Sequence, residues 1–200
     1  MPRKPSRRTY AETVGEISIE WNYLERRLHV VAFHYLKGDP EIASRIFAGM
    51  GNVSFSDFLT YLCQRFEPDK HIRNHVLHLI KAFYILRENR NIIEHSVPSL
   101  SAEAKYLGSV QKSNRIGVLM AFEVPIKDLK QILHDIREYK TYSTILTAFI
   151  LDRNDMATKS NSGSGATPQV PLHKLAASFD KLPLPRKINP IPHLEGRPFG

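Results

Sequence analysis

The sequence predicts an all-α protein, built as a bundle of four to five helices with a small β-hairpin. Several long stretches repeat apolar residues at alternating steps of three and four, the period of a helix, and one short stretch is rich in β-branched and aromatic residues instead. Residues 1–8 and 155–200 show neither pattern. We therefore expect a basic disordered N-terminus (1–8), a helical bundle domain (9–154) and a disordered proline-rich tail (155–200).

The first two helices are expected on either side of Gly38. The first runs from about Thr9 to Leu36, and Gly38 ends it because glycine favours the position just after a helix. Its apolar stripe comprises Val14, Ile17, Trp21, Leu24, Leu28, Val31 and Tyr35. Asp39 and Pro40 suit the N-cap and first turn of a short second helix. The residues expected to face inward on that helix are Ile42, Ile46 and Phe47.

The third and fourth helices are separated by Pro68. Ser54 is the expected cap of the third helix, and Pro68 stops it. Its expected buried side comprises Phe55, Phe58, Leu59, Leu62 and Phe66. The fourth helix spans about Asp69 to His95. Its apolar positions are Ile72, Val76, Leu79, Phe83, Leu86 and Ile93, with a second strip at Leu77, Ile80 and Tyr84. A helix with two apolar sides is central or is covered by a partner chain, so we expect a dimer through this helix.

Residues 104–124 are the exception to the helical pattern. The runs from Tyr106 to Val110 and from Ile116 to Val124 read as two strands, with Ser113 and Asn114 between them. A fifth helix follows from near Pro125, and its stripe comprises Leu129, Ile132, Ile136, Tyr139, Leu146 and Ile150. The periodicity ends after Asp152.

The basic charge lies at the two ends of the chain. The formal net charge is +8, of which residues 1–8 carry +4 and residues 155–200 carry +3, so the bundle domain is nearly neutral. Flexible basic ends attract polyanions such as RNA without reading sequence, or they serve solubility alone. The one cysteine, Cys63, excludes an internal disulfide and fits a reducing compartment. With no apolar run of membrane-spanning length and no secretion signal, we expect a soluble, cytoplasmic protein.

An arginine followed by a histidine after four to six intervening residues is the pattern that points to a reaction. Chance predicts about two such pairs. Five occur: Arg27/His34, Arg65/His71, Arg73/His78, Arg90/His95 and Arg186/His193. Context selects Arg90 and His95. Position 90 falls on the apolar stripe of the fourth helix, where a charge is costly unless it is paired or faces a cleft. The segment also ends the helix, where a loop lets a substrate approach.

The segment around this pair, Leu86-Arg87-Glu88-Asn89-Arg90-Asn91-Ile92-Ile93-Glu94-His95-Ser96, resembles the signature of the HEPN superfamily of helical bundles. That signature is an arginine, often followed directly by a polar residue, with a histidine four to six residues further on. Asn91 fills the polar position. The opening of the chain, Gly15-Glu16-Ile17 through Trp21-Asn22-Tyr23-Leu24-Glu25, also looks like the first helix of bacterial bundles of this kind. The resemblance covers about residues 9–154 and implies a HEPN-like bundle.

The resemblance implies a homodimeric RNA endonuclease that works without metal or cofactor, as a toxin or phage-defence effector. His95 can move a proton at the ribose 2′-OH or at the leaving oxygen. Arg90 can brace the scissile phosphate, and Asn91 can orient either group. A cognate antitoxin protein is a further implied partner. One branch of the family has a modified tyrosine two residues after the histidine. Val97 stands there in this chain, so that mode of control is not expected.

Several other interpretations stay open. Arg90 can form a salt bridge to a neighbouring acid, with His95 favoured at the helix end by the macrodipole. On an ideal helix the two residues lie about 140° apart, so they converge only if the helix end distorts or a dimer brings them together. The chain can also be a non-catalytic HEPN-like module that binds a partner protein or nucleotide.

Two features outside this segment also have more than one interpretation. The chain can be a helical adaptor that acts through its proline-rich tail. The histidines at positions 71, 75 and 78 have a spacing that can bind metal, but we expect a polar helix face and no metal site.

Overall fold

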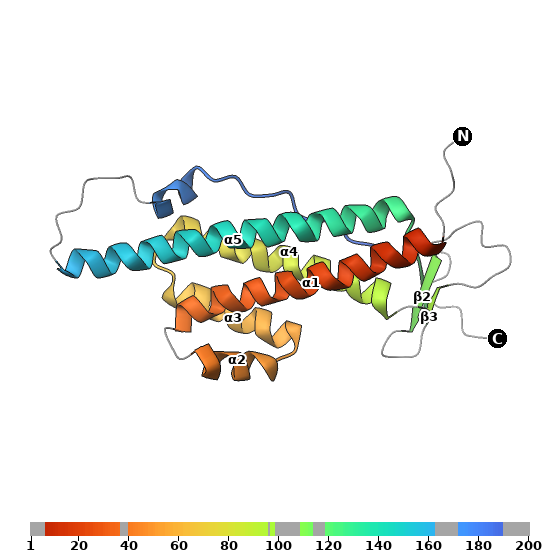
Figure 1. Ribbon diagram of the computed structural model, residues 1–200, viewed down its shortest axis with the longest axis horizontal. Coiled ribbons are helices and arrows are strands. Elements are labelled where there is room, and N and C mark those ends of the chain that lie inside the picture. The colour runs from red at the N-terminus through yellow and green to blue at the C-terminus, as the bar shows by residue number, and fades with distance from the viewer. Residues whose placement is uncertain are drawn as a thin grey trace. The chain divides into compact units, whose positions relative to one another are not determined.

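The structure is a computed structural model that describes residues 7–36, 40–95, 97–98, 109–113, 119–162 and 172–189. It is mostly helical, as predicted (Figure 1). The elements are α1 (Arg7–Leu36), α2 (Pro40–Ala48), α3 (Asn52–Phe66), α4 (Lys70–Glu94), β1 (Val97–Pro98), β2 (Ser109–Ser113), β3 (Leu119–Glu123), α5 (Ile126–Ser162) and the 3-10 helix η1 (Leu172–Ala177).

The chain divides into two compact units. The first unit comprises residues 1–22, 85–137 and 185–200, and the second comprises residues 23–84 and 138–184. Each unit therefore takes part of α1, α4 and α5. The two units are described separately below.

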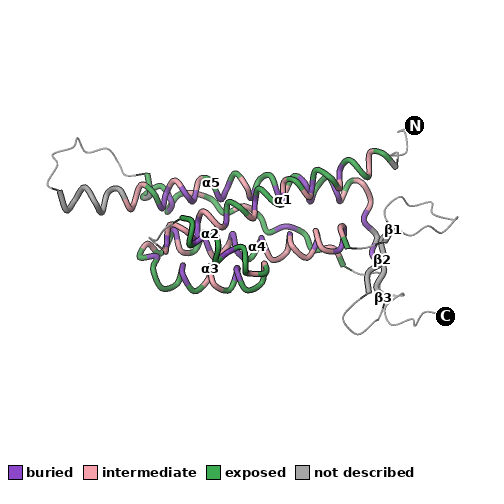
Figure 2. Tube along the Cα trace, turned by 60° about the horizontal axis from the view of Figure 1, so that its bottom comes forward, coloured by how far each residue is buried: buried purple, intermediate pink, exposed green. Residues whose placement is uncertain are grey.

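The core of the second unit is apolar and aromatic. Figure 2 shows buried positions recurring at short intervals along the helices, as the predicted stripes require. The fully buried residues include Leu24, Leu28, Val31, Phe55, Leu59, Ile72, Val76, Leu79, Phe83 and Leu146. At one end of this core the His29 ring lies 4.5 Å from that of Phe55 and 5.1 Å from that of Phe47, centroid to centroid. The second unit thus buries the central part of α4 within the chain, one of the two arrangements that its two apolar sides allowed, and the dimer expected through this helix stays a prediction.

A buried ion pair joins the segment after α3 to α5 in the second unit. The Glu67 carboxylate, just after α3, pairs with Arg153 of α5 and accepts a hydrogen bond from the Tyr35 hydroxyl at 2.9 Å. The Glu67 side chain has no exposed surface. Burial and the nearby carboxylate raise the pKa of Tyr35 well above its ordinary value, so its hydroxyl remains a donor.

The interior of the first unit gathers residues from four stretches of chain. Among the described residues of this unit, the buried apolar ones are Ile17, Trp21, Leu86, Ile92, Ile93, Phe122, Val124, Leu129, Ile132, Leu133 and Ile136. β2 pairs antiparallel with β3, with Val110 opposite Phe122, and β1 pairs antiparallel with β2. Ser113, which the sequence placed between the two strands, is instead part of β2 and lies opposite Leu119. Residues 114–118, which connect β2 to β3, lie outside the described residues, so the hairpin as a unit stays a prediction.

Three details of the second unit differ from the sequence prediction. Ile42 and Ile46 were expected inward on α2, but they are 60% and 43% exposed, and Ala43 and Phe47 are buried instead. Neighbouring helix positions lie about 100° apart, so Ile46 cannot share the inward direction of Phe47. Phe66, the last residue of α3, is exposed rather than buried. Gly51, not Ser54, holds the N-cap position of α3, with extended backbone (φ −72°, ψ 157°).

Asp69 caps the start of α4, near the position at which the sequence predicted that this helix begins. The Asp69 Oδ1 atom accepts hydrogen bonds from the backbone N–H groups of His71 at 2.7 Å and Ile72 at 3.0 Å. These bonds satisfy two of the N–H groups that a helix start leaves without a partner, and they fix the beginning of α4.

Part of the expected disordered tail has a defined course. In the second unit, residues 172–184 pack on α4 and α5, and the Phe179 ring stacks on that of Tyr142 at 5.3 Å. In the first unit, the backbone of residues 186–188 is hydrogen-bonded to α4. The structure differs here from the expectation. A proline-rich composition indicates that a segment forms little regular structure by itself, but it does not reveal whether the segment packs on another part of the chain. Residues 163–171 and 190–200 lie outside the described part.

Candidate functional site

The three predicted site residues lie together where α4 ends. Arg90 and Asn91 stand in the last turn of the helix, which finishes at Glu94, and His95 is the next residue. The His95 backbone N–H still donates to the Asn91 carbonyl at 3.2 Å, so the helical hydrogen-bond pattern extends to the histidine. The His95 side chain is exposed. The end of α4 therefore carries a solvent-exposed His95 and, five residues earlier, a partly covered Arg90.

Arg90 is held by two neighbours on its own helix. Its Nη2 atom pairs with Glu94 Oε2, and its Nη1 atom donates to Asn91 Oδ1 at 3.2 Å. The Arg90 side chain is 24% exposed and that of Glu94 is 14% exposed. The ion pair that the sequence left open as an alternative is thus present. Among the described residues, no hydrogen bond joins Arg90 to His95.

One donor of Arg90 lacks an acceptor. Its Nε–H is buried and has no hydrogen-bond partner within the part of the chain that the structure describes. A buried N–H without an acceptor is costly, because it has lost water and gained nothing in exchange. An oxygen atom that reached this edge of the guanidinium would remove that cost.

Ser18 of α1 completes the polar cluster, and sequence reasoning missed it. Its hydroxyl donates to Glu94 Oε1 at 2.5 Å and lies 3.2 Å from the Val14 carbonyl oxygen. Ser18 and Glu94 are 76 positions apart in the chain. No local pattern links two such positions, although Ser18 directly follows Ile17 of the α1 stripe and was therefore bound to lie near the helix interface.

Asn89, one residue before Arg90, binds the backbone of the tail. Its side chain is fully buried; its Nδ2 donates to the Arg186 carbonyl at 2.8 Å and its Oδ1 accepts from the Ile188 N–H at 2.9 Å. Lys187, between these two, pairs with Glu88 at 2.6 Å. The last turns of α4 are therefore fastened to residues 186–188 on one side and to Ser18 on another.

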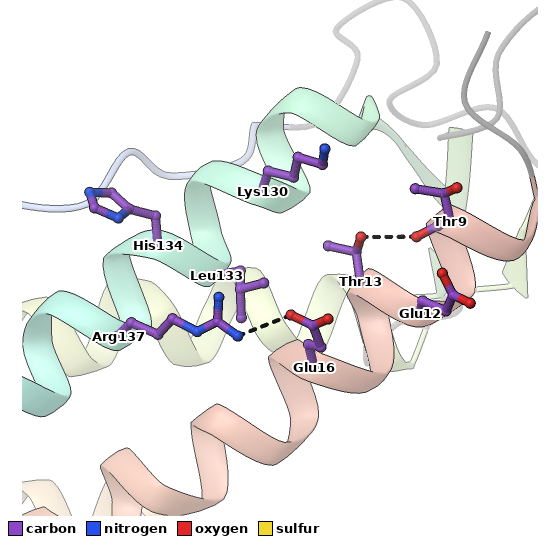
Figure 3. A pocket seen from close by; sticks show the side chains of 8 residues that line it. All are labelled: Thr9, Glu12, Thr13, Glu16, Lys130, Leu133, His134 and Arg137. Atoms are coloured by element: carbon purple, nitrogen blue, oxygen red, sulfur yellow. Dashed lines mark hydrogen bonds and ion pairs between the residues drawn. The ribbon is translucent and has the colours of Figure 1, made fainter. Parts of the chain in front are cut away.

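A polar groove lies between α1 and α5 in the first unit. Its volume is about 430 Å³. Figure 3 labels the residues that line it, which are Thr9, Glu12, Thr13 and Glu16 of α1 and Lys130, Leu133, His134 and Arg137 of α5. Arg137 crosses the groove to Glu16 at 3.0 Å and to Glu20 at 3.2 Å. These pairs hold the two helices together. The groove presents both charge signs, so it favours neither a polyanion nor a polycation.

Two of the three histidines of α4, His75 and His78, bind protein groups, whereas His71 is exposed. His75 is buried: its Nε2 atom donates to the Ala176 carbonyl at 3.0 Å, and its Nδ1 atom lies 2.5 Å from the Tyr142 hydroxyl. His78 Nε2 donates to the Leu182 carbonyl at 2.8 Å. Burial lowers the pKa of both imidazoles. Sequence reasoning placed these residues on a polar face because it could not foresee residues 172–184 lying over them.

No metal-binding constellation was found in the described part of the chain: no three or more histidine, cysteine or acidic side chains there are grouped to hold a metal ion. Cys63 is buried, and burial raises the pKa of its thiol to about 12, so it is a weak nucleophile.

Comparison with known proteins adds no relative. No protein-family model matches the chain, and neither a curated protein nor a solved structure is significantly similar to it. None of the helices within the described ranges is long and apolar enough to cross a membrane.

Proposed function

We propose that this chain is a metal-independent RNA endonuclease of the HEPN type, acting as a toxin or phage-defence effector. The observation that supports this most is that Arg90, Asn91 and His95 stand within six residues at the end of α4, with His95 exposed and Arg90 held by Glu94 and Asn91. An imidazole can transfer the proton of the ribose 2′-OH, and a guanidinium can stabilise the charge that develops on the phosphate.

The chemistry assigns one task to each side chain. His95 takes the proton from the ribose 2′-OH as that oxygen attacks the phosphorus, or gives a proton to the leaving 5′-oxygen. Arg90 faces the extra negative charge of the phosphorane-like transition state, where a charge-assisted hydrogen bond is strongest. Asn91 already binds Arg90 and so limits the orientations of the guanidinium.

A single histidine cannot serve as base and acid in the same step, so the proposal includes a homodimer. Two chains related by a two-fold axis would place two copies of the α4 end on one RNA strand. The second imidazole would then supply the proton that the first cannot.

The test is RNA cleavage by the purified protein in excess EDTA. We expect cleavage to persist, and His95→Ala to lower its rate by about 10²–10⁴-fold, as the loss of a general acid–base group does. His71→Ala is the matched control, because His71 is an exposed histidine on the same helix. Its rate should stay within about twofold of wild type, since it is remote from the proposed chemistry. The same pair should be compared for growth inhibition when expressed in bacterial host cells.

Two results would contradict the proposal. One is cleavage that disappears with EDTA, since a metal would then be required. The other is cleavage that His95→Ala leaves intact while both variants unfold at the wild-type temperature.

A non-catalytic binding module is the second candidate, and the Arg90–Glu94 ion pair favours it. A guanidinium already neutralised by a carboxylate is less available to a phosphate. This function predicts that the wild-type protein leaves RNA intact in EDTA and that His95→Ala changes nothing, while the chain binds a partner protein or a nucleotide.

A further inference from the structure

We propose that Glu94 is a positioning residue for Arg90, and that Ser18 of α1 holds Glu94 in that role. This inference rests on the proposed function and adds two residues to its site. Neither residue is part of the Arg-x4–6-His pattern, and Ser18 lies on a different helix.

The two oxygens of the Glu94 carboxylate are used separately. Oε2 pairs with Arg90 Nη2, while Oε1 accepts the Ser18 hydroxyl at 2.5 Å. A carboxylate bound at both oxygens cannot rotate freely about its last torsion. The pair is also mostly covered, at 24% and 14% exposure, so water and salt screen it less than an ordinary surface pair.

This arrangement fixes the guanidinium from two sides. Glu94 binds Nη2 and Asn91 binds Nη1, which leaves three of the five N–H donors of the arginine, and one of these three, Nε–H, is buried. A long arginine side chain otherwise samples many rotamers and would have to be ordered during each turnover. Holding it beforehand lowers the barrier of the step in which phosphate charge develops.

Glu94 also opposes phosphate binding through its own charge. Its removal should therefore affect RNA binding and catalysis differently: the ground-state attraction for RNA is kept or improved, and the stabilisation of the transition state is weakened. A merely structural glutamate would change stability without producing this separation.

The first experiment measures kcat and KM for RNA cleavage in EDTA with Glu94→Ala, Glu94→Gln and Ser18→Ala. We expect Glu94→Ala to lower kcat by about 10–100-fold, the loss typical of a misplaced catalytic group, with KM unchanged or lower. Glu94→Gln retains an acceptor oxygen and should recover most of kcat. Ser18→Ala should fall between wild type and Glu94→Ala.

Glu41→Ala is the matched control. Glu41 forms the same i, i+4 ion pair with Arg45 at 2.8 Å, but both side chains are at least 74% exposed and lie on α2. Its loss removes one acidic charge and one helical ion pair, and it should leave kcat and KM at their wild-type values.

The second experiment is independent of activity. Phenylglyoxal reacts with free guanidinium groups, and mass spectrometry of the digested protein gives the rate at Arg90. We expect slow modification in the wild type and at least a roughly fivefold faster rate in Glu94→Ala, because a guanidinium without its carboxylate is more accessible. The rate at Arg90 in Glu41→Ala should equal that in the wild type.

The outcomes separate the two proposals. Wild-type kcat in Glu94→Ala, or an unchanged rate of Arg90 modification in that variant, overturns the positioning role. If wild-type protein leaves RNA intact, the proposed function fails and takes the catalytic half of this inference with it. Phenylglyoxal reactivity then decides only whether Glu94 orders Arg90.

Discussion

At the residue scale, polar side chains at the end of α4 bind particular atoms in distant parts of the chain. Asn89 is buried and uses both ends of its amide on backbone groups 97 and 99 positions away. The sequence indicated Arg90, Asn91 and His95, since they lie within six residues of one another. It did not indicate Ser18, Asn89 or Ile188, because their contacts join positions far apart in the chain and depend on how the helices pack.

Asn89→Ala should destabilise the protein measurably. The substitution leaves the Arg186 carbonyl and the Ile188 N–H without their partner, which costs about 1–3 kcal/mol for buried polar groups. Urea unfolding followed by circular dichroism gives the free energy of unfolding. Asn74→Ala, at an exposed position of the same helix, is the control and should change it by less than about 0.5 kcal/mol. Equal stability of both variants would mean that the Asn89 hydrogen bonds contribute nothing net.

At the element scale, helices with a clear apolar period were predictable and the short ones were less so. Six of the seven stripe positions of α1 are buried. A long apolar repeat defines a single face of the helix, and only one orientation of the helix buries that face. On α2 the same reasoning was wrong at Ile42 and Ile46, since nine residues give too few turns for residue type to define an inward face. The course of residues 172–184 was not predictable either, because it depends on α4 and α5.

The contact between residues 172–184 and α4 should make stability depend on pH. Burial lowers the pKa of His75 below its ordinary value of 6.5, with Lys181, His78 and His71 adding repulsion and the Ala176 carbonyl opposing the shift. Folding therefore favours neutral His75. Its contribution is complete above pH 6.5 and declines as the pH falls below it, where the unfolded chain takes up the proton first.

Urea unfolding between about pH 5 and 7.5 measures this dependence. Wild-type stability should fall toward pH 5, and His75→Gln should make the fall shallower by up to one bound proton. Asn74→Ala, which removes no ionisable group from an exposed position of the same helix, should retain the wild-type slope. A His75→Gln curve parallel to wild type would show that His75 does not titrate differently on folding.

At the scale of the whole molecule, charge is distributed unevenly along the chain. Residues 1–8 supply +4 of the net charge of +8. A basic segment of this kind adds sequence-independent attraction for nucleic acid, and the attraction weakens as salt rises. The same excess would keep the protein dispersed even without a nucleic-acid ligand.

Deleting residues 2–8 distinguishes these two roles. If the segment binds RNA, the deletion should weaken binding of a 2′-O-methyl RNA and reduce the slope of log K against log salt by up to about 3, near 0.7 for each phosphate that is no longer neutralised. Fluorescence anisotropy at several salt concentrations measures both quantities. Unchanged affinity and slope would leave solubility as the role of the segment.

The amide of Asn89 grips peptide groups, not side chains. Any residue with an ordinary backbone, except proline at 188, offers it the same two atoms. Substitutions at positions 186 and 188 can therefore keep both hydrogen bonds to Asn89. Lys187 differs, because its side chain forms the ion pair with Glu88. Residues 186–188 can thus stay bound to α4 while the side chains at positions 186 and 188 change.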